Sequence, residues 1–170
     1  MTAVGAAPGE PMPDSLIARM VGHVGMVIPT WFRAEVPQAT VRDLLSLALR
    51  DVDRFVALPD VLVVVDGAPH VLGVVESIRA EALQAHGRTF EILSLPQNLG
   101  KGGAVATGFQ RLLEAPHLDL LCVRDHDGDH SIYDLPHLVS LADQVRAAEG
   151  TELVIACGCR ADPHRPLGFE

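Results

Sequence analysis

Residues 118–130 read LDLLCVRDHDGDH, an apolar run that ends in a cluster of acidic residues. An apolar run of this length is typical of a buried strand, and ligands bind open α/β sheets beside the carboxyl ends of the strands. Asp125 and Asp127 stand one residue apart just after the run. Paired carboxylates suit a hard divalent cation, and such a cation suits a diphosphate. We therefore predict a site for a diphosphate-containing ligand at this strand end.

Similar apolar runs recur along the rest of the chain. We expect strands at residues 24–28, 61–65, 90–95, 118–123 and 153–157. Helical periodicity separates them, as in the apolar face formed by Val71, Val74, Val75 and Ile78. Strands that alternate with single helices form βαβ units. The sequence therefore predicts an α/β fold, an open and mostly parallel sheet with helices on both faces.

Length and composition restrict the classes of protein to consider. A chain of 170 residues predicts one domain, which we place at residues 21–170 after a flexible tail at residues 1–20. The formal net charge is −9 and no block of Lys or Arg occurs, so nucleic acid is not an expected partner. Three cysteines form no disulfide framework, which favours the cytoplasm. No apolar run is long enough to span a membrane, although association with a membrane surface stays open.

The acidic cluster has two interpretations. In the first, Asp125 and Asp127 each give one oxygen to Mg²⁺ or Mn²⁺, which offsets the negative charge of a diphosphate. In the second, the cluster is a turn capped by Asp and Gly before a helix. His126 and His130 are either ligands, pH-sensitive neighbours or exposed turn residues.

A glycine-rich segment, LGKGG at residues 99–103, opens the third expected helix. Backbone N–H groups at such a helix start can approach a phosphate closely, and Lys101 adds a positive charge. The alternative is a flexible helix entry without a ligand. The turn after the first expected strand contains no glycine, which argues against a dinucleotide-binding Rossmann domain.

Three further residues follow strand ends or stand near them. Asp66 is placed to accept hydrogen bonds from a base or ribose, but Asp-Gly is equally a common turn. Arg160 pairs either with a phosphate or with a surface acid. Trp31, the single tryptophan, either stacks on a nucleobase or packs within the protein.

Five segments together resemble the family 2 glycosyltransferases of the GT-A fold, above all the dolichyl-phosphate-mannose and polyprenyl-phosphate-sugar synthase branch. Residues 28–33, IPTWFR, resemble the family's Ile-Pro-Thr-Tyr-Asn-Arg, and residues 64–67, VVDG, resemble its Val-Asp-Asp-Gly-Ser. Residues 98–104, NLGKGGA, resemble its glycine-rich helix entry, and residues 125–130, DHDGDH, its Asp-Ala-Asp-Gly-Gln-His. Residues 154–160, VIACGCR, resemble Val-Ile-Gly-Ser-Arg.

This resemblance implies a UDP- or GDP-sugar donor and a divalent metal, Mn²⁺ or Mg²⁺. It implies that Pro29, Thr30 and Glu35 lie near the base, with Asp66 on the base or ribose. It further implies that Asp125 holds the ribose or the metal shell and Asp127 the metal itself. Asn98 and Lys101 belong to the donor-binding helix entry, and Arg160 lies near the phosphates.

The chain also departs from the family pattern. Phe32 replaces an Asn, and one Asp of the second motif is absent. The family takes its general base from a segment after the fifth strand, where this chain offers Asp162 and Glu170 and neither lies in a matching motif. The catalytic base is therefore unassigned, and the chain resembles the donor-binding half of a longer fold, truncated after it.

We expect a metal-dependent glycosyltransferase that moves a sugar from a UDP- or GDP-sugar to a polyprenyl phosphate, a saccharide or a small molecule. One alternative is a catalytically silent nucleotide-sugar-binding module that needs a partner chain or acts as a regulator. Assembly into a homo-oligomer also stays open. Another is a sugar nucleotidyltransferase, although those enzymes place a glycine-rich loop after the first strand and this chain does not.

Overall fold

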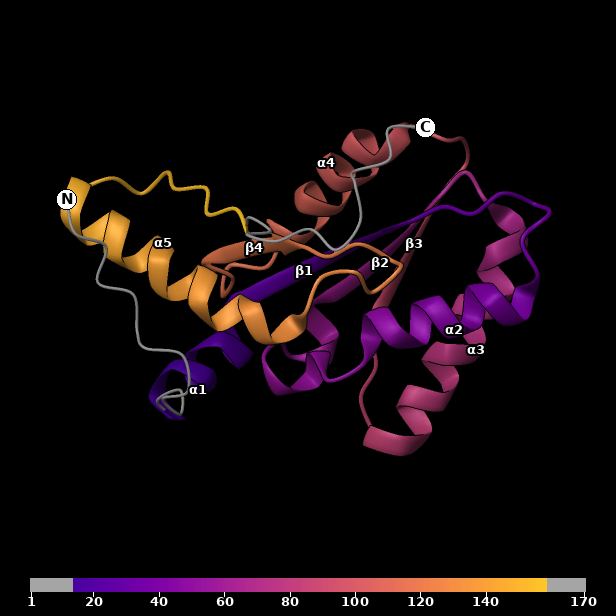
Figure 1. Ribbon diagram of the computed structural model, residues 1–170, viewed down its shortest axis with the longest axis horizontal. Helices are drawn as coiled ribbons and strands as arrows, with labels where there is room; N and C mark the ends of the chain where they lie inside the picture. Colours follow the sequence, from indigo (N-terminus) through magenta and orange to yellow (C-terminus); the bar gives the residue numbers. More distant parts are fainter. Residues whose placement is uncertain (1–13, 159–170) are drawn as a thin grey trace. The chain divides into compact units, whose positions relative to one another are not determined.

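The computed structural model describes residues 14–158. Four strands are present in this range, β1 (Val24–Thr30), β2 (Val61–Asp66), β3 (Glu91–Leu95) and β4 (Leu120–Val123) (Figure 1). The α-helices are α1 (Asp14–His23), α2 (Gln38–Leu49), α3 (Pro69–His86), α4 (Gly100–Leu112) and α5 (Leu135–Glu149). Short 3₁₀ turns occupy Val52–Arg54, Leu58–Asp60 and Ile132–Asp134. Within the described range no helix is both long and apolar enough to cross a bilayer.

The chain divides into two compact units, Met1–Ile132 and Tyr133–Glu170. The first unit holds the whole sheet and helices α1 to α4, and the second holds α5. Helix α1 begins at Asp14, so residues 14–20 are helical although the sequence analysis placed them in a flexible tail.

The sheet of the first unit is open and entirely parallel, with strand order β3-β2-β1-β4. The predicted fold class is therefore confirmed at the level of a parallel α/β sheet with flanking helices. Every residue of β1 and β2 is buried, which explains why these strands are continuous apolar runs without alternation. The direction of strand addition reverses at β1. Strands β2 and β3 are added in turn on one side of β1, and β4 pairs with β1 on its other side.

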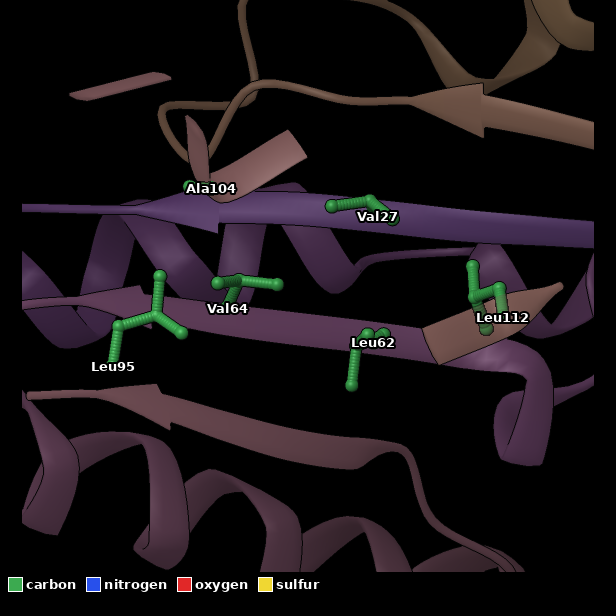
Figure 2. Close-up of a cluster of buried hydrophobic side chains, with 6 residues drawn as sticks. All are labelled: Val27, Leu62, Val64, Leu95, Ala104 and Leu112. Carbon is green, nitrogen blue, oxygen red and sulfur yellow. The ribbon is translucent and has the colours of Figure 1, made fainter. Parts of the chain in front are cut away.

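Helices cover both faces of this sheet, α4 on one side and α2 with α3 on the other (Figure 1). The core under α4 contains buried apolar side chains from three strands and from the helix (Figure 2). Val27, Leu62 and Val64 come from β1 and β2, and Ala104 and Leu112 come from α4. These contacts fix the start of α4 above the carboxyl ends of the strands.

One glycine lets α4 approach the sheet closely. A Cβ atom at Gly108 would lie 2.8 Å from both γ-carbons of Val27 and 3.1 Å from Val64. The helix can therefore sit this close only because position 108 has no side chain.

The predicted fifth strand, residues 153–157, is wrong. This segment has no regular secondary structure, and Leu153 and Ile155 are 92% and 91% exposed. A strand needs the N–H and C=O groups of a neighbour, and among the described residues β4 pairs with β1 alone. An apolar run shows that a segment can form a strand, but the segment becomes one only where another strand is free to pair with it.

Candidate functional site

A cavity of about 240 Å³ lies at the carboxyl ends of β1, β2 and β4, beside the start of α4. This is the point where the strand order reverses, the usual place for ligands in open parallel sheets. Clefts and cavities that bind small molecules measure about 300–1,000 Å³, so a larger ligand would extend beyond this cavity. Its lining residues are Pro29, Thr30, Trp31, Asp66, Asn98, Gly100, Lys101, Ala104, Asp125, His126 and Asp127.

Most of the residues predicted from the sequence line this one cavity. They are Pro29, Thr30, Asp66, Asn98, Lys101, Asp125 and Asp127. Glu35 is exposed and is not among the lining residues, so its expected place beside a nucleotide has no geometric support. Arg160, Asp162 and Glu170 lie outside the described residues.

Asp66 holds the loop that precedes α4. Its side chain is buried, and its Oδ1 accepts a hydrogen bond of 2.7 Å from the backbone N–H of Leu99. Gly67 makes this approach feasible, because it has a φ of +63° and a Cβ there would lie 2.1 Å from the backbone nitrogen of Asn98. The Asp-Gly pair is thus a turn and a lining element at once, so the two interpretations made from the sequence are not exclusive.

The start of α4 is organised by a side chain next to it. Asn98 Oδ1 accepts a 2.7 Å hydrogen bond from the N–H of Gly100, the first residue of the helix. The first N–H groups of any α-helix have no partner within it and favour anions. Asn98 and Asp66 therefore fix the position of a helix N-terminus at the edge of the cavity.

Asp125 lies between two groups that carry or can carry positive charge. Its Oδ1 is 2.6 Å from Lys101 Nζ, and its Oδ2 is 3.5 Å from His130 Nε2. The Asp125 side chain is 26% exposed, whereas that of Lys101 is 64% exposed. The described structure thus joins the acidic cluster to the glycine-rich helix entry.

The turn at residues 125–129 packs against α2. Asp127 Oδ1 accepts a hydrogen bond of 3.1 Å from the N–H of Asp129, which closes the turn locally. Gly128 has a φ of +73°, and a Cβ there would lie 2.6 Å from Leu47 of α2. This packing gives the glycine of the acidic cluster a structural role.

The His126 ring is held in a defined orientation. Its Nδ1 lies 3.1 Å from the carbonyl oxygen of Pro29. The ring meets the buried Phe32 edge to face, with centroids 4.5 Å apart. A carbonyl can only accept a hydrogen bond, so Nδ1 donates and Nε2 of the neutral ring carries the lone pair. The sequence alone left the role of His126 open among a ligand, a pH-sensitive neighbour and an exposed turn residue. Its contact with the Pro29 carbonyl joins residues far apart in sequence, so no local pattern predicts it.

The donor set suits a hard cation that is shared with a ligand. Among the described residues no group of three or more His, Cys, Asp or Glu is arranged to hold a metal ion. Two carboxylates, Asp125 and Asp127, do line the cavity, and Mg²⁺ is commonly held by one or two carboxylates together with phosphate oxygens. The residues therefore fit a cation that arrives with a diphosphate better than one caged by protein alone.

The charge of the lining also bears on the ligand. Three carboxylates, Asp66, Asp125 and Asp127, face one ammonium group, that of Lys101. A diphosphate would meet net negative charge here unless a cation accompanied it. Trp31, which is 42% exposed, adds an aromatic surface to the lining.

A buried cation stands directly before the acidic turn but outside the cavity lining. Arg124 is 7% exposed, and burial lowers the pKa of its guanidinium. Its Nη1 donates to the carbonyl oxygen of Arg50, just after α2, at 3.5 Å. Its Nε has no partner in the described structure. We assign Arg124 to the contact between the segments that follow β4 and α2 rather than to ligand binding.

A scan against protein-family models found no match, and searches of curated proteins and of solved structures found no similar chain.

Proposed function

We propose that the chain binds a nucleotide sugar together with a divalent cation in this cavity, as the donor-binding part of a glycosyltransferase. The observation that carries the proposal is that the acidic turn, Asp66 and the lysine at the start of α4 line one cavity. These groups come from three separate segments of the chain, and each lies at or after the carboxyl end of a strand. The resemblance of the same segments to family 2 glycosyltransferases supports a sugar nucleotide over other diphosphates.

The chemistry of transfer gives each group a task. Asp125 and Asp127 would hold Mg²⁺ or Mn²⁺, which offsets the charge that develops on a departing nucleoside diphosphate. The start of α4 would direct its N–H groups at the phosphates. Trp31 offers a face on which a base or sugar ring can stack, and His126 Nε2 offers an acceptor for a ligand hydroxyl.

The fluorescence of Trp31 provides a direct test, because it is the single tryptophan of the chain and lines the cavity. UDP or GDP should change this emission in the presence of Mn²⁺ or Mg²⁺ and much less in the presence of EDTA. At a ligand concentration of about 100 times Kd, binding should add about 2.7 kcal/mol to the free energy of unfolding.

Asp127→Asn should abolish the cation-dependent part of this response while the protein stays folded. The matched control is Asp43→Asn, which removes one negative charge from an exposed position on α2. If no nucleoside diphosphate changes the emission or the melting temperature of the unaltered protein, the proposal is wrong.

A binding module without transfer activity is the second candidate, and one observation favours it. Each carboxylate of the cavity already has a partner, Leu99 for Asp66, Lys101 for Asp125 and Asp129 for Asp127. With Asp66 bonded to the loop before α4 and with Asp125 and Asp127 assigned to the cation, none of the three is assigned as a general base toward an acceptor. Donor binding without release of UDP or GDP in the presence of polyprenyl phosphate or saccharide acceptors would support this second candidate.

A further inference from the structure

The cavity contains the only lysine of the chain. Lys and Arg together number 13, and Lys101 is the single lysine among them. We propose that Lys101 is a resident counter-ion that holds Asp125 while the cavity is empty. It gives up Asp125 to the incoming metal ion and turns to the phosphate of the ligand. This inference rests on the proposed function and adds a means by which cation and nucleotide binding depend on each other.

The ion pair has the geometry that this exchange requires. Lys101 Nζ lies 2.6 Å from Asp125 Oδ1. Asp125 is also one of the two carboxylates suited to the cation. Ammonium and metal ion therefore compete for the same oxygen. The lysine side chain is 64% exposed, and exposed pairs contribute little to stability, so the contact can break at small cost.

The identity of the residue supports a mobile role. All the remaining residues counted among the Lys and Arg of the chain are arginines. Arg binds carboxylates through a rigid planar fork, whereas Lys carries a compact charge on a flexible stem with rotatable donors. A side chain that moves between a carboxylate and a phosphate needs the second set of properties.

The position of Lys101 also points to an anionic ligand. Lys101 is the second residue of α4, and a cation in the first turn of a helix is disfavoured by the helix dipole. Asp125 offsets this cost in the empty cavity. Once a metal ion occupies Asp125, Lys101 loses the negative charge that offsets the helix dipole. An anion placed over the helix start can replace that charge, and the phosphate of the ligand is such an anion.

The binding of Mn²⁺ alone tests the competition without any nucleotide or turnover. Lys101→Met keeps an unbranched side chain of similar length and removes its charge. Mn²⁺ should therefore bind about two- to fivefold more tightly, the amount expected for loss of an exposed ion pair. Calorimetry or the Mn²⁺ spin-resonance signal measures this affinity. The control Arg88→Met removes one positive charge from an exposed position in the turn before β3, and it should leave Mn²⁺ affinity unchanged.

Nucleotide binding tests the second half of the exchange. With saturating Mn²⁺, Lys101→Met should bind UDP or GDP about tenfold more weakly because a charged contact to phosphate is lost. Unchanged Mn²⁺ affinity in this variant, or unchanged UDP and GDP affinity, would overturn the inference. A third outcome separates this inference from the proposed function. If Mn²⁺ binds Lys101→Met more tightly but neither the variant nor the unaltered protein binds UDP or GDP, the competition between Lys101 and the cation for Asp125 is supported and the proposed function is refuted.

Discussion

Single side chains can hold neighbouring loops together and line the cavity at the same time. Asp66 is the clearest case, because its buried carboxylate accepts from the Leu99 N–H and still lines the cavity. The sequence placed Asp66 correctly at a strand end, since its position follows from the apolar run before it. Its hydrogen bond to a residue 33 positions away was beyond any local pattern.

Cys122 of β4 predicts a measurable pH dependence. Burial raises the pKa of its thiol from 9.0 to about 12, although the residue as a whole is only partly buried. The unfolded chain therefore loses this proton at lower pH than the folded chain. The stabilisation is complete below about pH 9 and is lost as the pH rises toward 12.

The test compares the free energy of unfolding at pH 8 and pH 10. The unaltered protein should lose more stability over this interval than Cys122→Ala, whereas the exposed Cys157→Ala should behave like the unaltered protein. Equal losses in the unaltered protein and Cys122→Ala would show that the thiol is not shielded.

At the scale of elements, the placement of α4 sets the geometry of the cavity. Gly108→Ala should push the helix away from β1 and β2, because its Cβ would meet Val27 at 2.8 Å. Overpacking of this kind costs about 1–3 kcal/mol of unfolding free energy. Gly102→Ala, on the same helix with no atom within 4 Å of its Cβ, should cost nothing or stabilise slightly.

Urea unfolding of the two glycine variants measures this difference. The displaced helix start should also weaken the proposed nucleotide binding in Gly108→Ala, because Lys101 lies at the end of α4 that faces the cavity. Equal stabilities for the two variants would contradict the close packing of α4 on the sheet.

At the scale of the whole molecule, a net charge of −9 should govern the response to salt. Repulsion among excess carboxylates destabilises the compact state, and salt screens it. The melting temperature should therefore rise as NaCl increases from about 10 to about 200 mM, over which the Debye length falls from about 30 Å to less than 10 Å.

The ion pairs are not expected to reverse this trend. Pairs such as Arg42–Glu81 and His23–Asp119 are largely exposed, and such pairs contribute about 0–1 kcal/mol. The control is the same titration at a pH where the net charge approaches zero, where the rise should disappear. A melting temperature that falls with added salt would mean that these pairs outweigh the general repulsion.

The sequence by itself determined the parallel sheet and the strand ends that carry polar groups. This was feasible because continuous apolar runs and helical periodicity are local properties of the chain. The tertiary structure alone decided which strand ends meet, the ion pair between Lys101 and Asp125, the orientation of His126, and the failure of residues 153–157 to form a strand. These features depend on strand order and on contacts between segments far apart in sequence, and no local pattern encodes such contacts.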